Sequence, residues 1–101
     1  MNTRQSTATI THWVDGKLYQ GRSSRHAPVY NPALGAVANE VSLADAHDVD
    51  VAVQSAYKAF AVWADTSALR RARVMFKFKE LIEKHHDDLA ACITREHGKV
   101  F

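Results

Sequence analysis

The 101-residue sequence has little cysteine, glycine or proline, and it lacks any long hydrophobic run. Its single cysteine, Cys92, excludes an intramolecular disulfide framework and fits a reducing compartment. A membrane-spanning helix needs about 20 consecutive apolar residues, and the polar N-terminus lacks the apolar core of a secretory signal. The four glycines are scattered and do not form a phosphate-binding loop. We therefore expect a cytoplasmic protein without a membrane partner.

A strong charge of either sign is also absent. The chain has 13 basic and 11 acidic residues, which give a net charge of +2 with histidine neutral. So small an excess does not indicate nucleic acid or an anionic membrane as a partner. What the sequence does have is 47% hydrophobic and 24% charged residues, the composition of an ordinary globular protein.

The first 41 residues predict short β-strands after a polar lead-in at residues 1–9, which we expect to be disordered. Asp15-Gly16 separates two apolar-rich arms in residues 10–21 and predicts a β-hairpin with a type I′ turn, because both turn residues tolerate a positive φ. Short strands of this kind need further partners to form a stable sheet.

A second pair of strands is expected around an Asn-Pro turn. The first strand covers Val29 and Tyr30, and the second covers residues 36–41. In the turn between them, Pro32 fixes φ and Gly35 can take the positive φ that closes it.

From Ser42 onwards the pattern predicts three helices. Asp45 is the expected N-cap of the first, with Asp48 in capping-box position. An apolar stripe follows at helical spacing, formed by Val49, Val53, Ala56, Phe60 and Trp63. Residues 65–67 should end this helix and cap the next.

The second helix, predicted over residues 68–86, is apolar around more than half of its circumference. We therefore expect it to be sandwiched between neighbours. His86-Asp87-Asp88 should open the third helix, and Gly98 should end it.

The residues alone indicate no assembled active site. Cys92 is expected mid-helix on the buried face, as an inert thiol, because a reactive cysteine needs a nearby cation or a helix N-terminus. His85 and His86 are adjacent and point about 100° apart on a helix, which disfavours a shared metal. The basic residues between Arg70 and Lys79 are followed by Glu80 and Glu83, so a solvated face is favoured over a phosphate-binding stripe.

Seven short motifs nevertheless occur in an order that resembles the N-terminal end of the aldehyde dehydrogenase superfamily. They span Trp13 to Lys99, nearly the whole chain. The motifs are Trp13-Val14-Asp15-Gly16, Asn31-Pro32-Ala33-Leu34-Gly35, Asp48-Val49-Asp50-x-Ala52-Val53, Ala59-Phe60-x-x-Trp63, Arg71-x-Arg73, Leu81-Ile82-Glu83 through Leu89-Ala90, and Glu96-His97-Gly98-Lys99. Within the superfamily, residues 71–85 and 93–99 look most like the CoA-acylating methylmalonate-semialdehyde dehydrogenases.

The resemblance implies an α/β parent enzyme with NAD-binding, catalytic and oligomerisation domains, in which residues 10–101 are an incomplete N-terminal part of the NAD-binding domain. In this family a cysteine attacks the aldehyde, hydride passes to NAD, and CoA resolves the thioester in acylating members. The expected parent oxidises methylmalonate or malonate semialdehyde to an acyl-CoA and forms a homo-oligomer.

The family's catalytic and cofactor-binding residues would all lie beyond Phe101, so none is assigned here and Cys92 does not inherit the nucleophile's role. Some relatives bind a monovalent cation through backbone carbonyls before the Asn-Pro turn, which here are those of Val29 and Tyr30. We expect the 101-residue chain to be an inactive fragment that packs against the rest of its own chain.

Two other hypotheses remain open. The chain could be a small interaction module that buries its apolar helix faces by self-association. It could also bind nucleic acid or phosphate through the basic residues from Arg70 to Lys79, and steeply salt-dependent binding would then be expected.

Overall fold

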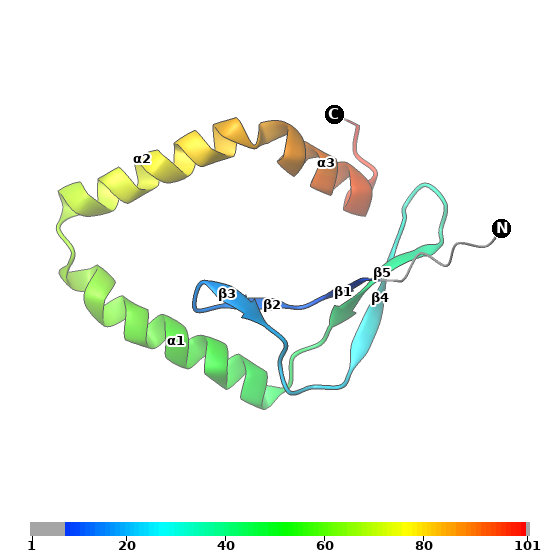
Figure 1. Ribbon diagram of the computed structural model, residues 1–101, viewed down its shortest axis with the longest axis horizontal. Coiled ribbons are helices and arrows are strands. Elements are labelled where there is room, and N and C mark those ends of the chain that lie inside the picture. Colours follow the sequence, from blue (N-terminus) through cyan, green and yellow to red (C-terminus); the bar gives the residue numbers. More distant parts are fainter. Residues whose placement is uncertain (1–7, 101) are drawn as a thin grey trace.

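The computed structural model describes residues 8–100, which form strands in the first half and helices in the second (Figure 1). The strands are β1 Ala8–Ile10, β2 His12–Val14, β3 Lys17–Tyr19, β4 His26–Tyr30 and β5 Val37–Ser42. The helices are α1 Ala46–Asp65, α2 Ala68–Lys84 and α3 His86–His97. The expected order of β-hairpins followed by three helices is therefore confirmed.

Strands β2 and β3 form the predicted antiparallel hairpin, in which Trp13 lies opposite Leu18. Its turn residues, Asp15 and Gly16, have φ values of 55° and 73°. Positive φ at both positions is the signature of a type I′ turn, whose twist matches that of the strands it joins.

The second sheet has the order β1-β5-β4, with β5 antiparallel to β4 and parallel to β1. The expected lead-in at residues 1–9 lies mostly outside the described residues, but its last two residues belong to β1 and correct that prediction. Ala8 and Thr9 pair with Asn39 and Glu40 of β5, a partner about 30 residues away that local polarity could not reveal.

Strand β4 is longer than the sequence predicted. It begins at His26, three residues before the expected start at Val29, because His26 pairs with Ser42 of β5. The turn between the strands has the expected closure, since Gly35 has a φ of 69° and its N–H donates to the carbonyl of Asn31 at 2.8 Å.

The helix ends follow their predicted caps. The Asp45 side chain accepts from the N–H of Asp48, and the Asp48 side chain accepts from the N–H of Asp45, which completes a capping box. Ser67 caps α2 by accepting from the N–H of Arg70. Gly98 ends α3 in the left-handed conformation, with a φ of 82°.

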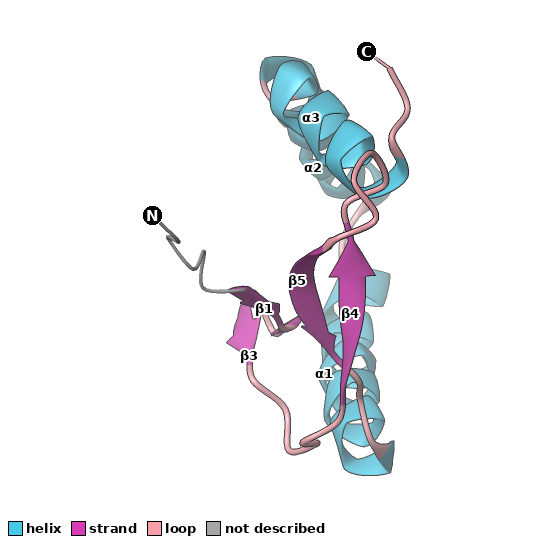
Figure 2. Ribbon diagram, turned by 90° about the vertical axis from the view of Figure 1, so that its right-hand side faces the viewer, coloured by secondary structure: helices cyan, strands magenta, loops and turns pink. Residues whose placement is uncertain are grey.

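The helices follow one another in an arc around the strands, as Figures 1 and 2 show, and they do not close over a core. The radius of gyration is 17.7 Å, against about 13 Å for a compact chain of this length. The accessible surface is 8760 Å², against about 5,700 Å² for a compact protein of this mass. Within residues 8–100 no hydrophobic side chain is buried.

The expectation that α2 is sandwiched is therefore not met by the described chain. Phe76 and Phe78 are 70% and 55% exposed, and residues on the opposite side of the helix are exposed as well. The physical reason is that no strand, and neither of the other helices, lies over either apolar face of α2. No helix in residues 8–100 is long and apolar enough to cross a membrane.

Candidate functional site

The most enclosed polar group of the described chain is the carboxylate of Asp48, in the first turn of α1. The residue is 3% exposed. Its Oδ1 accepts from the N–H of Arg22 at 2.7 Å and from the hydroxyl of Tyr19 at 3.2 Å. Its Oδ2 accepts from the N–H of Asp45 at 3.1 Å and from the N–H of Ser23 at 3.3 Å. We call Asp48 with these four donors the Asp48 clamp.

The surroundings of Asp48 favour its charged form. Burial would raise the pKa of this carboxyl, but the N–H groups of Arg22, Asp45 and Ser23 and the Tyr19 hydroxyl outweigh burial and hold the pKa well below its usual range. A depressed pKa means that the clamp contributes stability above the unfolded-state pKa, about 3.9. That stability is lost only as the pH falls through the still lower pKa of the folded state.

The pKa of the Tyr19 hydroxyl shifts in the opposite direction, upwards. Burial raises the pKa of Tyr19, and the negative charges of Asp48 and Asp45 raise it further, while Arg22 opposes them. The neutral hydroxyl is the form that donates to Asp48. The clamp is therefore complete across the neutral range of pH.

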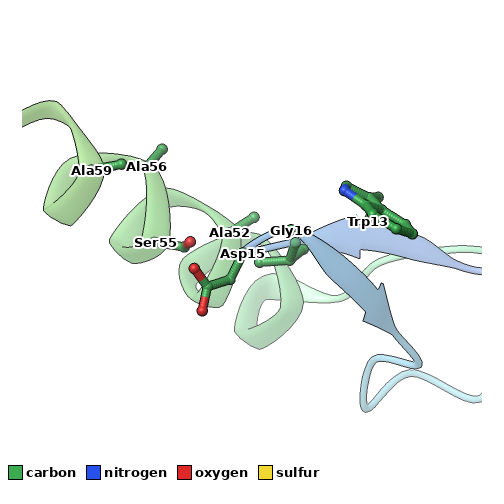
Figure 3. Close-up of a pocket in the computed structure, with 8 residues that line it drawn as sticks. Trp13, Asp15, Gly16, Ala52, Ser55, Ala56 and Ala59 are labelled. Atoms are coloured by element: carbon green, nitrogen blue, oxygen red, sulfur yellow. The ribbon is translucent and has the colours of Figure 1, made fainter. Parts of the chain in front are cut away.

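Next to the clamp, a hollow lies between the β2–β3 hairpin and α1 (Figure 3). One part, of about 420 Å³, is bordered by the hairpin turn and by small residues of α1, namely Ala52, Ser55, Ala56 and Ala59. The other part, of about 360 Å³, reaches His12, Tyr19 and Asp48. The Nε2 atom of His12 is buried and has no hydrogen-bond partner among the described residues.

This hollow has no constellation of catalytic groups. Its walls are mainly apolar, Asp48 is already saturated with donors, and Asp15 lies at the exposed hairpin tip. Among residues 8–100, no three His, Cys, Asp or Glu side chains are grouped so that they could hold a metal ion. The arrangement can position structural elements, but among the described residues the Nε2 atom of His12 is not hydrogen-bonded to a nucleophile.

The candidate cation ligands Val29 and Tyr30 lie at the end of β4, where the ladder with β5 is irregular. Val29 pairs with Asn39, but Tyr30 pairs with Val37, so that one extra residue of β5 lies between them. Such a bulge disrupts the local hydrogen bonds of the ladder. The structure thus places both residues at an irregular strand end, directly before the Asn-Pro turn.

The end of α3 approaches that same turn, which the sequence did not reveal. A Cβ atom at Gly98 would lie 3.4 Å from Cβ and Cγ of Pro32. Thr94 also donates from its hydroxyl to the carbonyl of Lys99 at 2.6 Å, which holds the chain after the helix. The turn after β4 and the C-terminus of α3 therefore lie close together, although Pro32 and Gly98 are 66 positions apart in the sequence.

Cys92 is exposed on α3, and this corrects the expectation of a buried thiol. The helical position was predicted correctly, but no described element covers that face. His85 and His86 contact the neighbouring carboxylates of Asp88 and Asp87 at 3.3 and 3.4 Å, so each is directed to a different partner.

The basic residues of α2 are partly neutralised along the helix. Lys77 lies 3.6 Å from Glu80, and Lys79 lies 3.7 Å from Glu83. All four side chains are well exposed, as expected for a solvated face.

Comparison with known proteins gives a consistent result. The sequence pattern of the Aldehyde dehydrogenase family matches residues 19–101. Malonate-semialdehyde dehydrogenase 1 of Geobacillus kaustophilus is 37% identical over 99 residues, which are 98% of this chain and 20% of that protein. The malonate-semialdehyde dehydrogenase of Bacillus pumilus is 37% identical over 97 residues, 96% of this chain and 20% of that protein.

Two solved structures share the fold of the chain. A protein of Sinorhizobium meliloti 1021, assigned as a methylmalonate-semialdehyde dehydrogenase and solved with NAD, has a TM-score of 0.89 at 39% identity. The match covers 93% of this chain and 19% of that one. The methylmalonate-semialdehyde dehydrogenase of Oceanimonas doudoroffii has a TM-score of 0.86 at 41% identity, over 90% and 18% of the two chains. The chain thus spans about a fifth of the length of the relatives it matches.

Proposed function

Because the chain belongs to the aldehyde dehydrogenase family, we propose that it serves as the N-terminal part of the NAD-binding domain of an NAD-dependent enzyme. The proposed reaction oxidises methylmalonate or malonate semialdehyde to an acyl-CoA. The observation that carries the proposal is the TM-score of 0.89, at 39% identity, to an enzyme solved with NAD. The proposed domain covers residues 10–101 together with the rest of a longer chain.

The described residues have a structural role in this proposal. We assign them no contact with a dinucleotide, because the glycines at positions 16, 21, 35 and 98 are scattered over a turn, a loop and a helix cap and do not form a phosphate-binding loop. A side chain at Gly21 would meet Asp48, so the space beside that backbone is already filled. The groups that bind NAD and CoA, and the nucleophile, are assigned to the rest of the enzyme.

The uncovered helix faces support this division. Apolar patches larger than a few hundred Å² on a protein surface mark interaction sites, and all three helices present large apolar side chains to solvent. The partner that we propose for them is the remainder of the same chain, which is four fifths of the length of the relatives. Assembly of the complete enzyme into a homo-oligomer is a further part of the proposal.

A chimaera tests the proposal directly. The 101 residues would replace the matching segment of the Geobacillus kaustophilus relative, and NADH formation would be followed with malonate semialdehyde and CoA. We expect the chimaera to be active and the isolated 101-residue chain to give no rate above the blank. A folded chimaera without activity, or an active isolated chain, would contradict the proposal.

Cys92 provides the matched control. Because it is exposed on α3 and has no assigned role in the reaction, Cys92→Ala in the chimaera should keep at least about half of the activity. A loss of a thousandfold or more would instead identify Cys92 as the nucleophile.

We also propose that the carbonyls of Val29 and Tyr30 contribute to a monovalent cation site in the complete enzyme. The support is the bulge at this position and the nearby C-terminus of α3, whose carbonyl groups carry partial negative charge. Replacing potassium and sodium by choline should lower the thermal stability of the chimaera. An unchanged melting temperature would contradict this assignment.

A self-associating module is the second candidate, and the exposed apolar helix faces are the observation that favours it. Family membership favours the first candidate. A chimaera that is folded and active would favour the first candidate over the second.

A further inference from the structure

The connection between the strands and the helices depends on polar contacts. Within residues 8–100 the only buried side chains are those of Ser42 and Asp48. The loop between β3 and β4 passes over the N-terminus of α1 at the position of Asp48. This is the point at which the hairpin, the loop and the helix meet.

The loop presents two successive backbone N–H groups to the same carboxylate. The N–H of Arg22 donates to Oδ1 and that of Ser23 donates to Oδ2. Successive amides that converge in this way form a small concavity suited to an anion. Here the anion is a side chain of the protein itself, delivered from α1.

Gly21 permits the close approach of the loop. Its φ is 76°, and a Cβ atom there would lie 3.1 Å from Oδ2 of Asp48 and 3.2 Å from Cδ2 of His12. Both the backbone conformation and the lack of space favour glycine. The sequence thus provides a special residue directly before the two amides that bind Asp48.

The four donors require a carboxylate. Each oxygen of Asp48 accepts two hydrogen bonds, so both are fully used. Asparagine has the same shape, but its amide nitrogen is a donor and would face two of the donors. Charged acceptors also make stronger hydrogen bonds than neutral ones.

We propose that the Asp48 clamp is the device that fixes the β2–β3 hairpin and the β3–β4 loop against the first turn of α1. Its function is conformational: it sets the position of the strands on the helix without an apolar core at the junction. Two exposed contacts flank it, Arg22 Nε to Asp45 Oδ2 at 3.4 Å and Arg25 Nη2 to the carbonyl of Ala44 at 2.9 Å. Because they are open to solvent, they contribute less than the enclosed carboxylate.

Amide hydrogen exchange of the unmodified protein gives the first test. At neutral pH the amides of Arg22 and Ser23 should exchange at least about tenfold more slowly than in a short peptide of the same local sequence. Exchange at the peptide rate for both amides would overturn the proposal, and this measurement needs no variant.

The variant test compares Asp48→Asn with Asp50→Asn, an exposed position on the same helix. Loss of the clamp should speed exchange about tenfold or more at Arg22, Ser23 and the hairpin, with α3 unchanged. Asp50→Asn should leave all of these rates unchanged. Equal effects of the two variants, or a uniform change across the protein, would contradict a local clamp.

Chemical rescue tests whether a free carboxylate can replace the carboxylate of the Asp48 side chain. In Asp48→Ala, sodium formate can place a free carboxylate in the vacated concavity. We expect formate, but not sodium chloride at the same ionic strength, to restore slow exchange at Arg22 and Ser23. If both salts act alike, the two amides do not form an anion cradle and the proposal fails.

Discussion

The strand region, up to the first turn of α1, and the helical region that follows differ in what they leave unsatisfied. In the strand region the Asp48 clamp and the sheet ladders pair polar groups with partners in the same region. In the helical region Ser67 caps α2 and Gly98 ends α3, yet Tyr57, Phe60 and Phe76 are 74%, 64% and 70% exposed. The strand region therefore joins distant segments through hydrogen bonds, although Nε2 of His12 has no partner among the described residues, whereas the helical region forms local caps and leaves its large apolar side chains exposed.

The difference follows from how far along the chain hydrogen bonding and apolar burial must reach to find their partners. A cap or a turn needs partners within a few residues, so a short chain can satisfy it. Burial of apolar surface needs a second surface, and each large side chain that finds one contributes about 1.5–3 kcal/mol. Three helices in an arc do not provide that surface for one another.

The largest expected effect concerns the open helix faces. The isolated 101-residue chain should self-associate at micromolar concentrations, and Phe60→Gln with Phe76→Gln should lower its association constant by on the order of 100-fold, because two exposed aromatic rings are lost. Sedimentation velocity at matched concentrations measures this.

Glu80→Gln on the polar side of α2 is the control and should sediment like the unmodified chain. If the unmodified chain is monomeric throughout the same concentration range, the open helix faces do not drive association. The proposed contrast between the strand region and the helical region would then be contradicted.

The features that the sequence predicted correctly are local. Asp15-Gly16 formed its hairpin turn, Asp45 formed the capping box with Asp48, and Gly98 ended α3. In each case the deciding groups lie within about four residues of one another, so the residue types determine the conformation. The resemblance to aldehyde dehydrogenases likewise rested on short motifs, and the family match confirmed it.

The features that could not be predicted join distant segments. The parallel pairing of β1 with β5, the contacts of Asp48 with Arg22 and Ser23, and the approach of Gly98 to Pro32 all depend on tertiary arrangement. Asp48 was identified as a capping-box residue and as part of a family motif, but nothing local indicated that a loop 25 residues earlier would bind the same carboxylate. The exposure of Cys92 was missed for a related reason, because its helix face was predicted but its covering element was not.

A second prediction sharpens the contrast within the strand region. Gly21 and Gly35 both have positive φ, at 76° and 69°, but only Gly21 would place a Cβ atom against other groups. Gly35→Ala should cost about 1 kcal/mol from backbone conformation alone. Gly21→Ala should cost about 2–3 kcal/mol, because Asp48 and His12 would have to move.

Thermal unfolding of the two variants in the chimaera tests this pair, and Gly21→Ala should lower the midpoint more than Gly35→Ala does. Equal shifts of the melting temperature would mean that the β3–β4 loop moves without a cost in stability and that the Asp48 clamp is not rigid.

The smallest expected effect is that of Tyr19, the outermost donor of the clamp. Burial first, then the hydrogen bond to Asp48, and then the negative charges of Asp48 and Asp45 raise the pKa of Tyr19 above its usual range, with Arg22 acting in the opposite direction. The stability that its neutral hydroxyl contributes is fully present below the unfolded-state pKa, about 10, and is lost as the pH rises through the higher folded-state pKa.

Tyr19→Phe should therefore lower the melting temperature slightly at pH 8 and have no remaining effect once Tyr19 is ionised. Tyr57→Phe, at a position 74% exposed, is the control and should leave the melting temperature at pH 8 unchanged. If Tyr19→Phe and Tyr57→Phe behave alike from pH 8 to the alkaline limit, Tyr19 is not part of the clamp, and the two amides and the capping box hold Asp48 without it.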